Sequence, residues 1–237
     1  MVYVTSDLHG FPFPRFRALL DKAGFGDDDF LFILGDVIDR NNDGGVSILK
    51  WLLFQPNVQL ILGNHEAMLL ACDFMFEEIT DEAIDALRPH NMKMLHTWKR
   101  NGADPTIDTL RKISPETRTD ILEYLRDAPL YETVSTAAGD FLLVHGGLGG
   151  YRPDKKISEY TPDELLWTRP TLDDQYSERF TTILGHTPTR YYGPDYRGKI
   201  LKTKTWINID TGAAGGLPPA LLRLDDMREF YIDDNNP

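Results

Sequence analysis

The sequence of 237 residues has a single cysteine, Cys72. One cysteine excludes an intrachain disulfide and a zinc site built from cysteines alone, and it favours a reducing compartment. The chain also lacks an apolar run long enough to cross a bilayer. Its first six residues indicate the start of a strand, without the basic region and cleavage site of a secretion signal. We therefore expect a cytoplasmic protein with no membrane partner.

Positive charge is scarce. The chain has 25 lysines and arginines against 37 aspartates and glutamates, which gives a formal net charge of -12. This balance disfavours broad binding to nucleic acid or to anionic membranes, so we expect no nucleic-acid partner. A local positive pocket for phosphate remains compatible with it, above all a pocket that contains metal ions.

Internal repeats and low-complexity linkers are absent as well, so we expect one domain over residues 1–237. A hydrophobic fraction of 41% is enough for a substantial core. In the first third, apolar runs alternate with amphipathic stretches in a β-α-β-α-β pattern, and right-handed crossovers would make its strands parallel. The expected strands are 2–6, 30–34 and 58–62, and the expected helices are 13–22, 46–54 and 67–79.

The remaining chain divides into a helical part and a strand-rich part. Residues 80–128 are rich in charge and in helical spacing, and we expect a helical cap over or beside the site. The later apolar runs are short and predict a more antiparallel sheet. These runs are 131–136, 140–144, 181–184, 206–209, 220–224 and 230–232. We expect two packed sheets with helices outside, an α/β fold.

Polar groups follow five of the predicted strands. The segment Gly35-Asp36-Val37-Ile38-Asp39-Arg40 comes directly after one of them, at the edge where open α/β sheets place their ligands. Oxygen and imidazole ligands suit divalent transition metals such as Mn, Fe or Zn. Asp36 has two carboxylate oxygens and could bridge two ions, and ions about 3.5–4 Å apart can generate a hydroxide for direct in-line attack on phosphorus. The candidate ligands are Asp7, His9, Asp36, Asn64, His145 and His186.

Each of these residues alone has a more ordinary explanation. Asp7 and His9 would usually form a turn or a helix cap, and a histidine such as His145 is more often a hydrogen-bonded structural residue. Five successive strand ends with metal-compatible groups outweigh those explanations. His90 and His96 lie in the helical part without this context, and we expect them to be structural or surface residues.

Cleavage of a phosphoester also needs a proton for the leaving group. His65 follows the candidate ligand Asn64, so it can reach the site as a general acid, and Asp39 can orient it and favour its charged form. Arg40 offers a fork suited to phosphate oxygens, although an arginine after an aspartate is usually a surface ion pair. Arg169 is a second candidate for phosphate binding.

The five segments around these candidate residues resemble five ordered motifs of the phosphoprotein phosphatase family of calcineurin-like metallophosphoesterases. They resemble most closely its bacterial and phage-type serine/threonine phosphatases. Trp98 with Asn101-Gly102, and residues 208–212, also resemble the bacterial members. The five motifs are Asp7-Leu8-His9-Gly10, Gly35-Asp36-Val37-Ile38-Asp39-Arg40, Gly63-Asn64-His65-Glu66, His145-Gly146-Gly147 and Gly185-His186-Thr187-Pro188.

The resemblance implies a four-layer α/β/β/α sandwich with a dinuclear metal centre, manganese being the first choice. It implies metal ligands at the six candidate positions, an acid pair of Asp39 and His65, and phosphate-binding arginines at Arg40 and Arg169. Two positions depart from the family pattern, because Ser6 and Asn41 stand where glycine is usual. Asparagine can adopt the left-handed conformation at moderate cost, so the turn is compatible with Asn41, and both departures can alter the loop geometry.

The resemblance leaves three hypotheses. The leading one is a metal-dependent serine/threonine protein phosphatase acting on phosphorylated proteins or peptides. The alternative is a symmetrical dinucleoside tetraphosphate hydrolase, which usually departs from the pattern at Asp39-Arg40 and Glu66. A third, of another class, is a pseudophosphatase that binds phosphopeptides, against which the complete ligand set and His65 argue.

Overall fold

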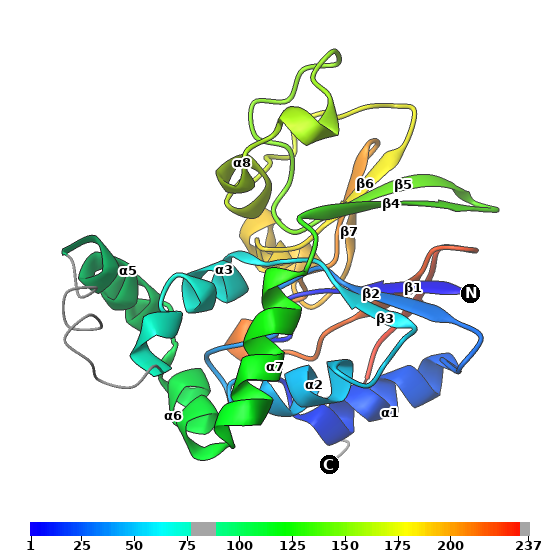
Figure 1. Cartoon of the computed structure of the whole chain (residues 1–237). Coiled ribbons are helices and arrows are strands. Elements are labelled where there is room, and N and C mark those ends of the chain that lie inside the picture. Colours follow the sequence, from blue (N-terminus) through cyan, green and yellow to red (C-terminus); the bar gives the residue numbers. More distant parts are fainter. Residues whose placement is uncertain (77–88, 233–237) are drawn as a thin grey trace.

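The computed structural model describes residues 1–76 and 89–232, which form two five-stranded sheets with helices on their outer sides (Figure 1). The predicted helix 67–79 and the predicted cap 80–128 fall partly on residues 77–88, outside the described residues. The single-domain organisation over residues 1–237 stays a prediction.

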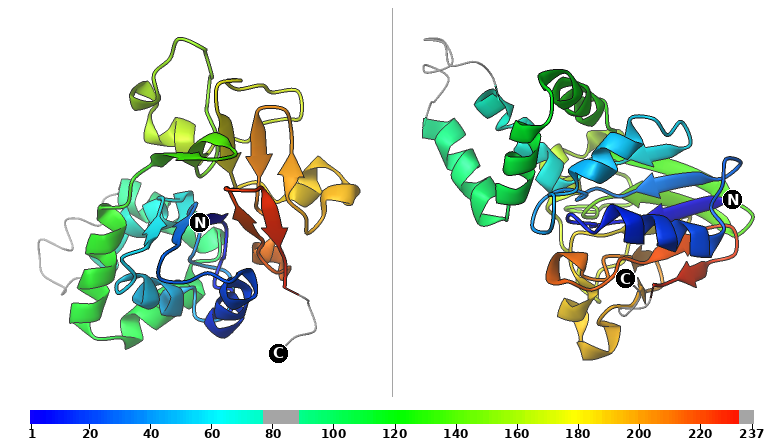
Figure 2. Two further views of the ribbon diagram at one scale, coloured as in Figure 1. Left: turned by 90° about the vertical axis from the view of Figure 1, so that its right-hand side faces the viewer. Right: turned by 90° about the horizontal axis from the view of Figure 1, so that it is seen from below.

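The first sheet has the strand order β10-β9-β1-β2-β3. Its centre confirms the predicted parallel strands, with Val4 opposite Phe32 and Ile33 opposite Leu60. The strand β9 pairs antiparallel with the free edge of β1, and β10 pairs antiparallel with β9, so late segments of the chain lie beside its first strand (Figure 2). The strands are β1 (Val2–Thr5), β2 (Phe30–Ile33), β3 (Val58–Leu60), β9 (Leu221–Arg223) and β10 (Arg228–Phe230).

The second sheet has the order β4-β5-β6-β8-β7 and corrects the expectation of a more antiparallel arrangement. Its three central strands, β5, β6 and β8, are parallel, because residues 145–180 and 185–205 are long enough for crossover connections. The run 220–224, assigned to this sheet, instead contains β9 of the first sheet, and the predicted strand 230–232 is displaced, because only Phe230 belongs to a strand, β10. The strands are β4 (Tyr131–Thr136), β5 (Gly139–Val144), β6 (Thr181–Leu184), β7 (Leu201–Lys202) and β8 (Trp206–Asn208).

Alternating side chains bury both faces of each sheet. Val4 points toward the other sheet and packs in a cluster with Phe141 and Ile183, whereas its neighbour Tyr3 packs toward the helices. On the far face of the second sheet, Leu142 packs in a cluster with Leu165 of α8. Three apolar layers therefore separate four structural layers, which confirms the α/β/β/α sandwich.

Most helices cover the first sheet. Ser114 caps α7 by accepting a hydrogen bond from the Thr117 amide at 3.2 Å, and Leu125 of this helix is buried in the same apolar cluster as residues of α1 and α2. The helices are α1 (Phe13–Ala23), α2 (Val46–Leu52), α3 (Asn64–Leu70), α5 (Pro89–Arg100), α6 (Asp104–Lys112), α7 (Pro115–Arg126) and α8 (Pro162–Leu166). The short 3₁₀ helices are η1 (Asp73–Phe76), η2 (Ile157–Glu159), η3 (Thr189–Tyr192), η4 (Pro194–Tyr196) and η5 (Ala213–Gly215).

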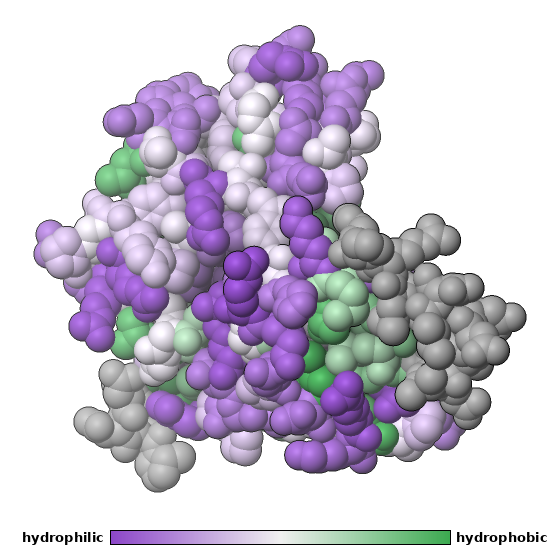
Figure 3. Space-filling model, turned by 90° about the vertical axis from the view of Figure 1, so that its left-hand side faces the viewer, coloured by the Kyte–Doolittle hydropathy of each residue, from purple (hydrophilic) through white to green (hydrophobic). Residues whose placement is uncertain are grey.

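The outer surface carries much of the polar sequence. The face that bears α5 and α6 is largely hydrophilic, with a smaller hydrophobic area (Figure 3). Among the helices in residues 1–76 and 89–232, none combines the length and the apolar character that crossing a bilayer requires.

Candidate metal centre

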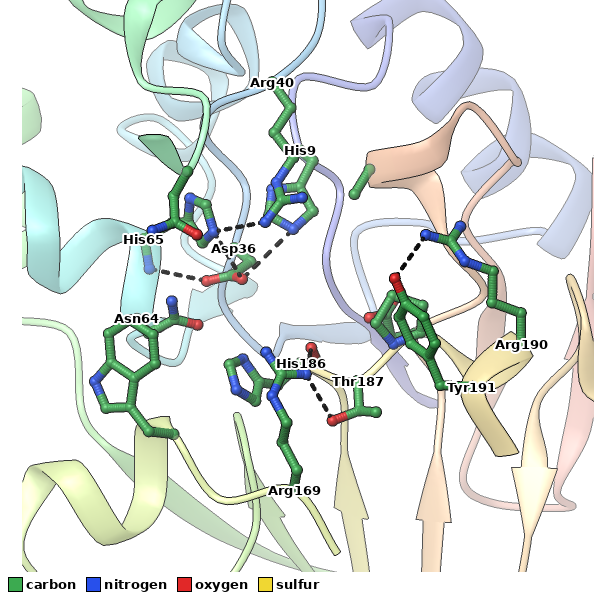
Figure 4. A pocket seen from close by; sticks show the side chains of 15 residues that line it. His9, Asp36, Arg40, Asn64, His65, Arg169, His186, Thr187, Arg190 and Tyr191 are labelled. Atoms are coloured by element: carbon green, nitrogen blue, oxygen red, sulfur yellow. Dashed lines mark hydrogen bonds and ion pairs between the residues drawn. The ribbon is translucent and has the colours of Figure 1, made fainter. Parts of the chain in front are cut away.

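The ends of β1, β2 and β3 in one sheet, and of β5 and β6 in the other, meet at a single place (Figure 4). The six candidate ligands converge there and are almost completely inaccessible to solvent. Burying so many polar groups is costly unless each has a partner. The buried set is Asp7, His9, Asp36, Asn64, His145 and His186.

Asp36 lies between two histidines. Its Oδ2 is 3.5 Å from Nε2 of His9, and its Oδ1 is 3.4 Å from Nε2 of His145. The amide of His65, in the first turn of α3, donates to Oδ1 at 3.0 Å and fixes the carboxylate. Each carboxylate oxygen of Asp36 therefore faces a different imidazole.

Hydrogen bonds and burial keep the two imidazoles neutral. Nδ1 of His9 donates to the Ile38 carbonyl at 3.0 Å, and Nδ1 of His145 donates to the Leu34 carbonyl at 2.7 Å. Burial lowers the pKa of both rings, that of His145 to about 3. Each Nε2 thus carries a lone pair aimed at Asp36, the usual arrangement of a metal-binding histidine.

Several acceptors in this cluster lack a donor. Within the described residues, Oδ1 of Asp7 and Nε2 of His186 have no hydrogen-bond partner. Nε2 of His145 lies 2.9 Å from Oδ1 of Asn64, so two acceptors face each other. Burial and the neighbouring carboxylates raise the pKa of Asp7 and Asp36 well above the usual range. Cations among these atoms would satisfy the unpaired acceptors and offset the buried charge.

The spacing suits two such cations. The potential ligand atoms of Asp36, His145 and His186 lie within 4.8 Å of one another, as do those of His9, Asp36 and His65. Asp7 borders the second group, with Oδ1 3.9 Å from Nε2 of His9. The nitrogen and oxygen donors fit manganese, iron or zinc.

His65 is already engaged through both ring nitrogens. Its Nδ1 donates to Oδ2 of Asp39 at 2.5 Å, and its Nε2 accepts from Nη2 of Arg40 at 3.2 Å. Asp39 is fixed in turn by Trp98 Nε1 at 2.7 Å and by the Thr106 hydroxyl at 2.6 Å. Asp39 is therefore hydrogen-bonded to His65, and two residues of the helical part hold Asp39.

Glu66 holds the loop after β2. Its carboxylate accepts hydrogen bonds from the amides of Asp36, Val37 and Ile38 at 2.8–3.2 Å, and from the Gly63 amide at 3.1 Å. The sequence alone gave no role for this carboxylate. The Glu66 side chain connects the second and third motifs through these hydrogen bonds and is not among the residues that line the pocket.

Asn41 does not adopt the left-handed conformation open to it. Positive φ angles occur instead at Asp39 (77°), Arg40 (71°) and Asn42 (49°). The Asn41 side chain donates to the His9 carbonyl at 2.9 Å and to the Ala213 carbonyl at 3.2 Å. It therefore connects three loops. At the other departure, Ser6 fits beside Gly185, where a Cβ would come within 2.5 Å of the Ser6 hydroxyl.

Replacing Asn41 with alanine should lower the free energy of unfolding by about 1–2 kcal/mol, because the His9 carbonyl would lose its donor. It should also weaken metal binding. Urea denaturation and a manganese titration measure both effects. Asn57→Ala is the matched control, since Asn57 also donates to two carbonyls, those of Gly26 and Asp29, outside the pocket. Equal effects of the two variants on metal affinity would contradict this role of Asn41.

A pocket of about 430 Å³ opens above the cluster. Arg40 and Arg169 line it, and Arg169 donates to the His186 carbonyl at 2.9 Å and to the Thr187 hydroxyl at 3.0 Å. His96 is exposed on α5 outside it, whereas the side chain of His90 lies outside the described residues.

Other pocket residues were missed from the sequence. Arg190 and Tyr191 follow the fifth motif within a few residues, and this closeness was the only sequence signal for them. Asp210 lies in the segment 208–212, and burial raises its pKa to about 7. Trp167 precedes Arg169 by two residues.

Curated relatives share the sequence over much of its length. A symmetrical bis(5'-nucleosyl)-tetraphosphatase of Buchnera aphidicola subsp. Schizaphis graminum is 33% identical over 211 residues, which cover 86% of this chain and 72% of the relative. The same named protein of Acidovorax sp. is 30% identical over 70% of this chain and 47% of its own length. With that of Buchnera aphidicola subsp. Acyrthosiphon pisum, at 34% identity, the chain aligns over 41% of the relative, less than half its length.

Solved structures share the fold. A putative diadenosine tetraphosphatase has a TM-score of 0.60 at 17% identity and covers 98% of this chain, with 92% of its own chain matched. A Saccharomyces cerevisiae protein serine/threonine phosphatase similar to human PP5 has the same TM-score at 16% identity, over 100% of this chain and 81% of its own. The family model for calcineurin-like phosphoesterases matches residues 1–209. The chain therefore belongs to the calcineurin-like phosphoesterase family.

Proposed function

We propose that this protein hydrolyses dinucleoside tetraphosphates symmetrically, at the central phosphoanhydride, and releases two nucleoside diphosphates. The observation that carries the proposal is the group of three arginines around one pocket in a chain of net charge -12. Arg40, Arg169 and Arg190 provide more positive charge than a single phosphomonoester requires. A chain of four phosphates matches it, because arginine forks bind phosphate oxygens in pairs. The names of the curated relatives support the same substrate class.

The expectation of a serine/threonine protein phosphatase acting on phosphorylated proteins or peptides is wrong, because the curated relatives are named as nucleotide hydrolases. Two of the three residues used to favour it have structural roles. Glu66 ties backbone amides together, and Asp39 is held by Trp98 and Thr106. These contacts stabilise the motif loops and do not select a substrate.

For the metal centre, we propose two divalent ions, manganese first and iron or zinc as alternatives. Asp36 would be shared, Asp7 and His9 would complete one site, and Asn64, His145 and His186 the other. When bound, such ions supply an activated water and neutralise charge on the reacting phosphoryl group.

The chain's own side chains would handle the substrate and the proton. Arg40 Nη2 would leave His65 for a phosphate oxygen and so free Nε2, which in the protonated ring gives its proton to the bridging oxygen of the leaving diphosphate. Asp39 would accept the Nδ1 hydrogen bond and keep the ring oriented with Nε2 toward the substrate. Arg169 would hold a flanking phosphate beside His186.

Purified protein with manganese should convert diadenosine tetraphosphate to ADP as the sole nucleotide product. We expect its kcat/KM to exceed that for phosphopeptides by at least about 10²-fold, because a site built for polar groups rejects substrates that lack them. Chromatography of the products identifies the nucleotide released and gives the rates from which the two kcat/KM values are obtained. Formation of AMP and ATP would contradict central cleavage. Phosphopeptide binding without turnover under any divalent metal would favour the pseudophosphatase.

A further inference from the structure

Two large aromatic side chains line the pocket yet remain open to solvent. Trp167, at the end of α8, is 41% exposed, and Tyr191, in η3, is 69% exposed. Large aromatic side chains are normally buried in the core of a stable protein. These two rings are exposed in a polar pocket instead, where they offer flat surfaces to a ligand.

Each ring is accompanied by an arginine. Arg169 follows Trp167 by two residues and is fixed by the His186 carbonyl and the Thr187 hydroxyl. Arg190 directly precedes Tyr191, with its guanidinium carbon 5.0 Å from the ring centroid, and its Nη2 donates to the Tyr191 hydroxyl at 3.3 Å. The pocket therefore has two units, each combining a flat ring with a phosphate-binding fork.

The two units belong to different elements in the second half of the chain, α8 and its C-terminal end for Trp167 and η3 for Tyr191. The Trp167 ring stands edge-on to His186, with centroids 5.9 Å apart, and it also borders a hollow formed by Lys93, Met94 and Thr97 of α5. Tyr191 lies with Arg190 on the side of His186 away from Asn64 (Figure 4). Trp167 shares its hollow with α5, and α5 packs against α3, the helix that begins at Asn64.

We propose that Trp167 and Tyr191 are the two nucleobase platforms of the site, one for each half of the substrate. This inference rests on the proposed function. A dinucleoside tetraphosphate cleaved at its centre carries one base at each end, at equal distances from the reacting bond. Stacking on an aromatic ring accepts any base, since every base has a π face. Arg169 and Arg190 then bind the phosphates next to their respective nucleosides.

The test is the KM for diadenosine tetraphosphate. Trp167→Ala and Tyr191→Ala should each raise it about five- to a hundredfold, the range expected for losing one base stack. Trp167→Phe and Tyr191→Phe should retain most of the affinity because they keep a ring. For inorganic tetraphosphate, which has no base, the alanine variants should change KM far less. Phe54→Ala is the matched control, since Phe54 is exposed on the surface away from the pocket.

A substrate with one base separates the two platforms. The combined Trp167→Ala and Tyr191→Ala effects should multiply for diadenosine tetraphosphate, whereas for adenosine 5'-tetraphosphate the double variant should lose no more than one base stack. Equal losses for the base-free and base-bearing substrates would overturn the platforms and leave the proposed hydrolase intact. Failure of the wild-type protein to cleave diadenosine tetraphosphate, with turnover of other phosphoesters, would overturn the proposed function and the platforms together.

Discussion

Replacing Asp36 with asparagine should lower kcat by at least about 10³-fold and abolish the stabilisation of the protein by manganese. Asp36 faces His9 with one oxygen and His145 with the other, so its loss removes the shared anionic ligand of both proposed ions. Metal ions supply several kcal/mol of transition-state stabilisation, and each 1.4 kcal/mol corresponds to about a factor of ten. Turnover and thermal unfolding, each with and without manganese, measure the two effects.

The same variant should be more stable than the wild type in EDTA. Burial and the Asp7 charge raise the pKa of Asp36 in the folded protein, so the folded state holds that proton more tightly than the unfolded state. The metal-free wild type therefore loses stability as the pH rises above about 3.9, the ordinary carboxyl value, and asparagine removes that loss. Asp104→Asn is the control, since Asp104 lies exposed at the start of α6, where it pairs with Lys99 of α5. Full turnover of Asp36→Asn at saturating manganese would contradict a shared ligand.

Replacing His65 with asparagine should lower kcat for the dinucleoside substrate by about 10²- to 10⁴-fold while preserving stabilisation by manganese. His65 Nδ1 is occupied by Asp39, so only Nε2 is available to deliver a proton. A phosphate leaving group, with a second pKa of about 6, needs this proton less than an alkyl alcohol does. The loss should therefore be larger for an alkyl phosphate ester than for the anhydride.

The control for this variant is His96→Asn on the exposed side of α5, which should leave both rates unchanged. A loss of manganese stabilisation in His65→Asn would assign His65 to the metal ligands, an alternative that its distance to Asp36 and His9 allows. An equal loss for both leaving groups would contradict proton transfer by His65.

The sequence was most informative about the strand ends. Apolar runs of four or five residues identified β1, β2, β3, β5 and β6, and the polar residues after them turned out to share one place. This succeeded because it required only local information: a buried strand is recognised by its own residues, and parallel strands bring their carboxyl ends to one edge. The order of the five motifs also indicated the family.

The substrate was the main error, and its cause is physical. Glu66 and Asp39 were used to distinguish two related enzymes, yet both carboxylates are buried and bind groups of the protein itself. A residue that holds a loop is needed whatever substrate the loop serves. The features that bear on the substrate, Arg190, Tyr191 and Trp167, carry no recognisable motif and become visible only when the pocket is assembled.

The sequence by itself determined which chemical groups stand at the strand ends, and hence the α/β sandwich and the type of reaction. Only the tertiary structure decided which distant residues support them: β9 and β10 pair with β1, Trp98 and Thr106 bind Asp39, and Asn41 bridges to Ala213. The reason is that periodicity and strand-end chemistry are encoded by neighbours in the chain. Contacts between residues tens to hundreds of positions apart depend on how whole layers pack, which no local pattern contains.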